Sequence, residues 1–222
     1  MELTNAVAVV TGANRGLGRH LAEQLVRRGA RVYAAARRPE TVELAGVVPL
    51  SLDVTDEESV RAAARAASDA TLLVNNAGIS TGATLLTGEP EAVRREMETN
   101  FFGPLAVTRA FAPVIEGNGG GAVLNVLSVL SWLHPAALGS YAATKAAAWA
   151  QTNAAREELA PRGIAVTALH VAYMDTDMAA RVPVERKVSP AEVAAQALDG
   201  IEKGVAEILA DEVTRQVKQG LA

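Results

Sequence analysis

A tyrosine, a lysine and a serine lie at spacings that suit acid–base chemistry on a carbonyl group. Tyr141 and Lys145 are four residues apart in a stretch of helical spacing, so their side chains share one face. A free phenol has a pKa of about 10, and we expect the Lys145 ammonium to lower it toward neutrality. Ser128, thirteen residues before the tyrosine, could stabilise oxyanion charge on a substrate. Ser131 is a weaker candidate for that role.

A glycine-rich turn predicts a site for a dinucleotide. The expected first strand, Ala6–Val10, runs directly into Thr11-Gly12-Ala13-Asn14-Arg15-Gly16-Leu17-Gly18, and a helix is expected from Leu17 to Arg28. Glycines let such a turn approach a pyrophosphate closely, and the helix N-terminus then faces the phosphates. The spacing differs from Gly-x-Gly-x-x-Gly, so an ordinary glycine turn is the alternative at this point.

Strand and helix patterns alternate along the chain, which predicts an α/β fold of the Rossmann type. This is a doubly wound parallel sheet of about seven strands with helices on both faces. The expected strands are short and continuously apolar, as in sheets covered on both faces: 6–10, 31–35, 48–52, 72–74, 122–127, 164–169 and 206–209. The expected helices are 17–28, 57–67, 92–115, 141–159 and 190–203. We interpret residues 1–222 as one domain.

Composition excludes several other classes of protein. The chain carries 21 basic and 25 acidic residues and no basic block, so nucleic acid is a poor partner. It has no cysteine and three scattered histidines, and we expect no metal site. The uncharged stretch 117–144 is long enough to span a membrane, but its asparagines, glycines and serines favour loops and a buried strand. We expect a cytoplasmic protein without a membrane anchor.

Together these elements resemble the short-chain dehydrogenase/reductase family over nearly the whole chain. Asn75-Asn76-Ala77-Gly78 resembles a family motif, Asn100 stands where the family has a catalytic asparagine, and Ser128, Tyr141 and Lys145 reproduce its Ser…Tyr-x-x-x-Lys set. The resemblance implies that Lys145 also binds the nicotinamide ribose and that Asn100 supports a water chain to it. The implied cofactor contacts are Gly12, Asn14, Arg15, Gly16, Leu17, Gly18, Asp53, Val54, Asn76, Ala77, Gly78, Tyr141, Lys145 and Thr176.

The end of the second expected strand favours NADP(H) over NAD(H). An acidic residue there would bind the ribose diol of NAD, but this chain has Ala36-Arg37-Arg38. Arginine matches the charge and geometry of a 2′-phosphate, and Arg15 is a second cation directed at the same region. The alternative is that Arg37 or Arg38 only caps a surface loop.

The sequence departs from the family after the sixth strand, where Val171-Ala172 replaces the usual Pro-Gly and puts the loop path in doubt. A short lid is expected around 177–189, which would leave an open or shallow site. His134 could polarise a substrate, although it is more simply a surface group. The sequence shows no arginine cluster that would bind a substrate anion. We expect instead an apolar pocket, and its lining would be Trp132, Leu133, His134, Leu138, Tyr173, Met174 and Met178.

These residues predict an NADPH-dependent reductase acting on an apolar ketone or aldehyde. The alternatives are an alcohol dehydrogenase that works oxidatively and a cofactor-sensing regulator that has lost turnover. The alanine-rich stretch 142–155 allows close helix approach, and family resemblance implies a homodimer or homotetramer built through such helices. Burial of these faces within one chain is the other possibility.

Overall fold

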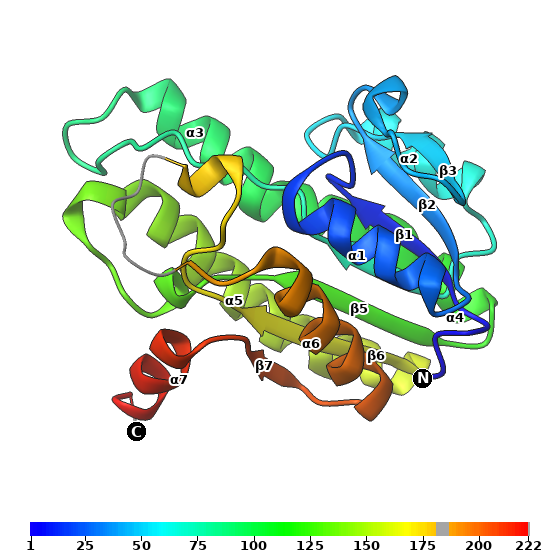
Figure 1. Ribbon diagram of the computed structural model, residues 1–222. Coiled ribbons are helices and arrows are strands. Elements are labelled where there is room, and N and C mark those ends of the chain that lie inside the picture. Colours follow the sequence, from blue (N-terminus) through cyan, green and yellow to red (C-terminus); the bar gives the residue numbers. More distant parts are fainter. Residues whose placement is uncertain (181–186, 222) are drawn as a thin grey trace.

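The computed structural model describes residues 1–180 and 187–221 and shows the expected parallel sheet (Figure 1). Within those residues seven strands are all parallel, in the order β3-β2-β1-β4-β5-β6-β7. The order reverses between β1 and β4, which is where doubly wound folds bind ligands. The strands are β1 Val7–Thr11, β2 Arg31–Ala36, β3 Val47–Ser51, β4 Leu72–Asn75, β5 Gly121–Val126, β6 Ile164–His170 and β7 Glu207–Leu209.

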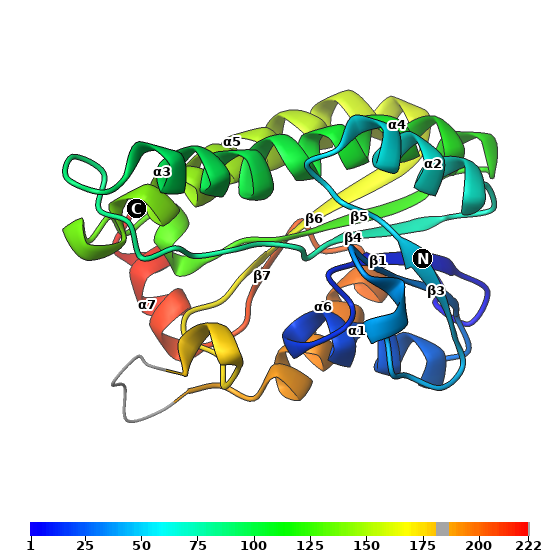
Figure 2. The ribbon, with the colours of Figure 1, turned by 90° about the horizontal axis from the view of Figure 1, so that it is seen from above.

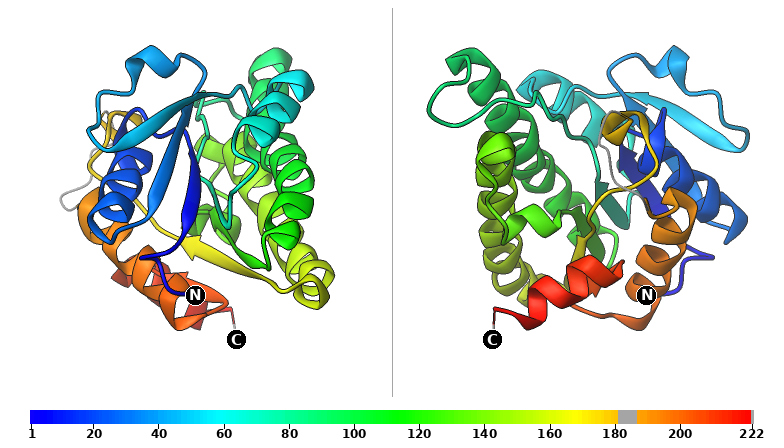
Figure 3. Two further views of the ribbon diagram at one scale, coloured as in Figure 1. Left: turned by 90° about the vertical axis from the view of Figure 1, so that its right-hand side faces the viewer. Right: turned by 60° about the vertical axis from the view of Figure 1, so that its left-hand side comes forward.

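Helices cover both faces of this sheet, which confirms the predicted layering. Helices α1 and α6 lie on one face, and α2, α4 and α5 lie on the other (Figures 2 and 3). The helices are α1 Gly16–Arg27, α2 Glu57–Ala66, α3 Pro90–Met97, α4 Gly103–Gly117, α5 Gly139–Leu159, α6 Pro190–Lys203 and α7 Glu212–Gln219. Two apolar clusters result, one under α1 and α6 and the other under α2 and α4.

A ladder of buried amides and hydroxyls fixes α4 and α5 on the sheet beneath the candidate site. The Asn75 amide of β4 donates to Thr108 Oγ1 of α4 at 3.0 Å and to Asn125 Oδ1 of β5 at 2.9 Å. The Asn125 amide in turn donates to Thr152 Oγ1 of α5 at 3.0 Å. Because breaking one such bond would strand buried polar atoms, the ladder holds both helices in one register.

Two helix predictions need correction. The expected helix 92–115 is interrupted, because five residues, Glu98–Phe102, form a π-helical segment between α3 and α4. Helix α7 was not expected, since its eight residues are too few to give a strong periodic signal. Residues typical of helix ends stand at the caps: the side chain of Ser189 accepts a hydrogen bond from Glu192 N, and Gly29, Gly163 and Gly204 adopt φ of 86°, 70° and 68°.

The chain contains no helix, among the residues described, that is long and apolar enough to cross a membrane. The uncharged stretch 117–144 instead forms the end of α4, strand β5, two short 3₁₀ turns and the start of α5. The expected lid around 177–189 lies partly outside the described residues, because 181–186 are not among them.

The glycine turn is held by contact between α1 and the end of β4. A Cβ on Gly18 would lie 2.3 Å from the Gly12 carbonyl oxygen and 2.4 Å from Asn76 Nδ2. That amide donates to the carbonyls of Thr11 and Gly12 at 2.8 and 3.2 Å. Gly12 adopts φ of 66°, a conformation that favours glycine. The turn therefore requires glycine at position 12 for its backbone conformation and at position 18 for space.

We expect Gly18→Ala to destabilise the protein by about 1 to 3 kcal/mol, because a methyl group must displace backbone or the Asn76 amide. Chemical denaturation of the cofactor-free chain measures this change. Gly117→Ala is the matched control, since a Cβ there meets no atom within 4 Å and alanine is the better helix former. Equal free energies of unfolding for the two variants would contradict the packing argument.

Candidate active site

A single long cavity of about 1350 Å³ runs along the carboxyl edge of the sheet in the described part of the chain. Its walls come from the residues that follow β1, β2, β3, β4, β5 and β6, together with α3, the start of α5 and the turn at 176–179. Strand direction explains this convergence, because parallel strands all end at the same edge. The size suits a dinucleotide with a small substrate beside it.

Ser128, Tyr141 and Lys145 all line this cavity. Tyr141 and Lys145 come from successive turns of α5, and the lysine Nζ lies 5.6 Å from the centre of the tyrosine ring. Lys145 is buried and donates from Nζ to the carbonyl of Val126 at 2.9 Å, at the end of β5. Its ammonium is therefore held between the tyrosine and the sheet.

The hydroxyl of Ser128 is prepared to act as a hydrogen-bond donor. Its Oγ accepts from Leu130 N at 3.1 Å and caps the short 3₁₀ turn Val129–Ser131. An oxygen that accepts from this amide keeps its own hydrogen free for a substrate oxygen. Ser131 is buried and does not line the cavity, so the geometry favours Ser128 for the serine role.

The pKa of Tyr141 moves in the opposite direction from the sequence expectation. Burial raises it above its ordinary value, and the negative charge of Glu96 raises it further. Burial also lowers the pKa of Lys145 to about 8, so the lysine carries less positive charge near neutrality than an exposed one would. The sequence reveals the lysine four residues away, but it does not reveal the low-polarity surroundings of the phenol or the Glu96 carboxylate on α3.

Asn100 sits in the π-helical segment and joins three parts of the site. Its Oδ1 accepts from Ile79 N at 2.9 Å, and its Nδ2 donates to the Ile79 carbonyl at 2.9 Å and to Thr144 Oγ1 at 3.1 Å. Thr144 donates in turn to the carbonyl of Tyr141 at 2.7 Å. Asn100 is buried and does not line the main cavity. The side chain thus braces the segment after β4 against the helix that carries the tyrosine.

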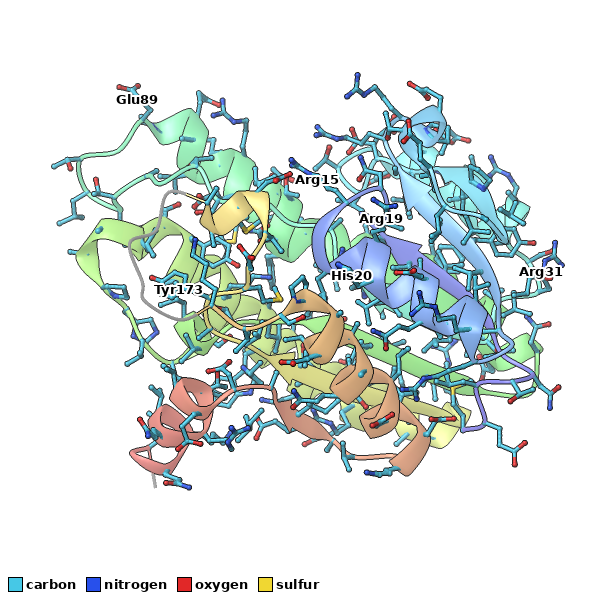
Figure 4. All side chains as sticks on the ribbon, viewed as in Figure 1. Arg15, Arg19, His20, Arg31, Glu89 and Tyr173 are labelled. Carbon is cyan, nitrogen blue, oxygen red and sulfur yellow. The ribbon has the colours of Figure 1, made fainter. Side chains whose placement is uncertain are left out.

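The expected cofactor residues from the glycine turn, β2, β3 and β4 also meet at this cavity. From the turn, Gly12, Asn14, Arg15, Gly16 and Leu17 line it, whereas Gly18 packs behind them. The lining also includes Arg37, Arg38, Asp53, Val54, Asn76, Ala77, Gly78 and Thr176. The Asn14 amide donates to Thr41 Oγ1 at 3.1 Å, which ties the turn to the residues after β2. Arg15 lies beside the 176–179 turn and pairs with Asp177 at 3.4 Å (Figure 4).

The substrate residues expected from sequence divide into two groups. Leu138, Tyr173, Met174 and Met178 line the cavity, whereas Trp132, Leu133 and His134 do not. Trp132 is a packing residue, because its ring stacks on buried His170 at 4.0 Å and meets Trp149 edge-on at 5.9 Å. His134 is exposed outside the lining. Trp132, Leu133 and His134 therefore do not contact the space in which a substrate would bind.

Two arginines at this cavity were not expected from the sequence. Among the described residues the lining includes five arginines, Arg15, Arg37, Arg38, Arg94 and Arg95. The last two come from α3, whose place at the cavity no local pattern revealed, and Arg94 pairs with Glu91. Ile79 and Thr81, after β4, were also missed, although their position just beyond the Asn-Asn-Ala-Gly motif is a usable signal.

The replacement of Pro-Gly by Val171-Ala172 is accommodated by a contact with the C-terminal helix. The backbone N–H of Ala172 donates to Asp211 Oδ2 at 2.8 Å, and buried Asp211 also caps α7 through Thr214. The backbone of Ala172 keeps a negative φ. The contact with the start of α7 therefore restrains the loop at Ala172, a position where the family's usual glycine would allow the backbone more conformations.

These residues fit a nicotinamide dinucleotide. The glycine turn and the N-terminus of α1 line the cavity and form a cradle for pyrophosphate, while arginines line the cavity beyond β2. Lys145 and Tyr141 stand at the β5 side, where a nicotinamide ribose would lie. In the described part of the chain, no group of three or more metal-ligating side chains gathers.

Comparisons with known proteins agree with this geometry. The short chain dehydrogenase family model matches residues 6–187. The chain is 32% identical to a 3-oxoacyl-[acyl-carrier-protein] reductase of Vibrio cholerae over 87% of this chain and 88% of that protein. It is also 32% identical to a galactitol 2-dehydrogenase (L-tagatose-forming) of Cereibacter sphaeroides over 89% and 88%. Several other relatives are longer, and the chain spans about three fifths of their length.

A solved structure is more similar still. It is a short chain dehydrogenase from Burkholderia cenocepacia in complex with NADP, 41% identical, with a TM-score of 0.95 over all of this chain and 94% of the other. The family match over most of the chain and the shared fold establish the family resemblance seen in the sequence. The chain belongs to the short-chain dehydrogenase/reductase family of oxidoreductases, which bind nicotinamide cofactors.

Proposed function

We propose that this protein is an NADPH-dependent reductase of an apolar ketone or aldehyde. The observation that carries the proposal is the convergence of Ser128, Tyr141 and Lys145 on one cavity whose other half is lined by the glycine turn and arginines. Donors at the serine and tyrosine can meet one substrate oxygen, which is the arrangement that carbonyl reduction needs.

Each side chain has a distinct task in this reaction. Bound NADPH supplies the hydride that reduces the carbonyl carbon. Ser128 donates a hydrogen bond to the carbonyl oxygen, and Tyr141 delivers the proton that the oxygen gains. A pKa of Tyr141 raised by burial supports this direction, since the phenol is then protonated when the substrate arrives. Lys145 lies beside the phenol and can replace its proton afterwards.

A preference for NADPH is supported by the end of β2. Arg37 and Arg38 are exposed there and line the cavity, and the position lacks the carboxylate that would bind the ribose diol of NAD. Arginine can bind a 2′-phosphate through two parallel hydrogen bonds. The Burkholderia cenocepacia relative, whose structure contains NADP, is consistent with this preference.

The apolar side chains around the catalytic groups support an apolar substrate. Leu130, Leu138, Tyr173 and Met174 line that part of the cavity, and Met178 stands exposed at its edge. The 3-oxoacyl reductase among the relatives favours reduction, whereas the galactitol 2-dehydrogenase keeps alcohol oxidation as the second candidate. Retention of both tyrosine and lysine argues against a sensor without turnover.

The proposal includes a homodimer or homotetramer in which the outer faces of α4 and α5 pair. These two helices lie side by side on one face of the sheet (Figure 2). Phe102, at the junction with α4, is 47% exposed despite its apolar ring. Light scattering of the purified chain measures the mass of the assembly.

The expected cytoplasmic location stays a prediction.

Replacing the proposed acid tests the mechanism directly. We expect Tyr141→Phe to lower the turnover of NADPH-dependent reduction at least about a hundredfold, roughly 2.7 kcal/mol, because the oxygen loses its proton donor. Cofactor binding should survive. Tyr33→Phe is the control, since that phenol lies in β2 and bonds to Asp69 at 3.0 Å. Near-normal turnover in Tyr141→Phe would exclude the proposed role.

Reversing one charge at the end of β2 tests the cofactor preference. Arg37→Asp should weaken NADPH binding at least about tenfold, because a charged hydrogen bond is lost and a repulsion introduced, while NADH binding is kept or improved. Fluorescence titration with both cofactors measures the change. Arg19→Asp, an exposed reversal on α1 outside the cavity lining, is the matched control (Figure 4). Equal losses for both cofactors would indicate misfolding instead.

The burial of Lys145 should make the free energy of unfolding depend on pH. Its pKa is about 8 in the folded protein and near 10.4 in a free chain, so the unfolded state binds more protons between those values. Stability contributed at this site therefore rises as pH increases from about 8 to 10.4. We expect Lys145→Met to be more stable than the wild type at pH 7 by on the order of 1 to 3 kcal/mol, an advantage that shrinks across that window. A pH-independent difference in denaturation would contradict the buried state.

A further inference from the structure

A buried carboxylate on α3 has no role in the proposed reaction. Glu96 has no exposed surface, although charged side chains are rarely buried without a partner. Its Oε1 accepts hydrogen bonds from the backbone N–H of Thr81 and, at 2.8 Å, from the Thr81 hydroxyl. Its Oε2 has no hydrogen-bond partner among the described residues. Such a group costs free energy, so its presence calls for a reason.

The residues that Glu96 holds form a wall of the active-site cavity. Ile79 and Thr81 both line it, directly after the Asn-Asn-Ala-Gly motif. Asn100 holds Ile79 by its amide and its carbonyl, and Glu96 holds Thr81 two residues later. The two side chains are four residues apart along α3 and the π-helical segment. One stretch of helix therefore fixes the 79–81 segment at two successive points.

Glu96 also acts on the catalytic tyrosine through its charge. Helix α3 packs against α5, and the Glu96 carboxylate raises the pKa of Tyr141 beyond the effect of burial. Lys145, from the same helix as the tyrosine, also lies beside its ring. The tyrosine also packs against an apolar cluster that includes Val129 and Leu130 of the turn after β5. Among the described residues, Glu96 and Lys145 thus place a charge of each sign near this tyrosine.

We propose that Glu96 is a positioning residue that clamps the 79–81 wall of the cavity and holds a negative charge on the helix that packs against the one carrying Tyr141. The proposal rests on Tyr141 serving as the acid of the proposed function. The two tasks belong to different atoms, because the clamp uses Oε1 as an acceptor, whereas the effect on the phenol requires the net charge. Variants can therefore separate them.

Two substitutions divide the tasks. Glu96→Gln keeps an oxygen that can accept from Thr81 but removes the charge, whereas Glu96→Met removes both at similar length. Both should lower the pKa of Tyr141 by about half a unit or more, since the nearby negative charge is gone. Only Glu96→Met should also raise the KM for the carbonyl substrate, about threefold or more, because the cavity wall loses its clamp.

Fluorine NMR of the full chain, with and without NADP⁺, measures this shift independently of turnover. Uniform 3-fluorotyrosine gives three signals, from Tyr33, Tyr141 and Tyr173, and Tyr141→Phe identifies the relevant one. The fluorine also lowers the phenol pKa, which brings the titration toward milder pH. Glu89→Gln is the matched control, because that carboxylate is exposed at the outer end of α3 (Figure 4).

An unchanged Tyr141 titration in both folded Glu96 variants would overturn the charge effect, and an equal shift in Glu89→Gln would show that it is not specific to Glu96. An unchanged KM in Glu96→Met would overturn the clamp. Failure of the proposed function is distinguishable, because it would appear as full activity in Tyr141→Phe whatever the fluorine titration shows.

Discussion

The site depends on the hydrogen bonds that join the end of β1 to the end of β4. The Thr11 hydroxyl donates to the carbonyl of Val74 and accepts from the backbone N–H groups of Asn76 and Ala77, while the Asn76 amide returns to the carbonyls of Thr11 and Gly12. These bonds close the seam where the strand order reverses. They fix the glycine turn on one side and the cavity wall at 77–81 on the other, so both halves of the site share one anchor.

The catalytic side chains take their positions from that anchor through a chain of buried contacts. The segment after β4 is held by Asn100, which also contacts Thr144 on α5, and Thr144 bonds to the carbonyl of Tyr141. Lys145 reaches back to the end of β5. Each contact involves a buried polar group whose loss would leave a partner unsatisfied. Tyr141 is therefore placed by a connected network, which would give the proposed reaction a proton donor already in position.

The sequence allowed most of the fold and the main chemical groups to be predicted. Continuous apolar runs such as 72–74 and 164–169 identified strands covered on both faces. The spacing from Ser128 through Tyr141 to Lys145 identified three side chains that the structure brings to one cavity. What could not be predicted depends on contacts distant in sequence. The π-helical break at Asn100, the packing of Trp132 on His170 and the arginines of α3 at the cavity leave no local pattern.

The pKa of Tyr141 also depends on contacts that are distant in sequence. A lysine four residues away is visible in the sequence, and it favours the phenolate. Burial and the carboxylate of Glu96, 45 positions earlier, act in the opposite direction and are stronger in the folded chain. The Tyr141–Lys145 pair indicates acid–base chemistry, but the surrounding structure sets the direction in which the pKa of the phenol shifts.

Hydride transfer itself is the most direct test of the account. The purified chain would be given NADPH in which both hydrogens at the nicotinamide C4 are deuterium, together with a panel of apolar ketones and aldehydes, and the products would be analysed by mass spectrometry. We expect an alcohol with one deuterium on the former carbonyl carbon. Tight binding of NADPH with no deuterium transferred to any member of the panel would contradict it.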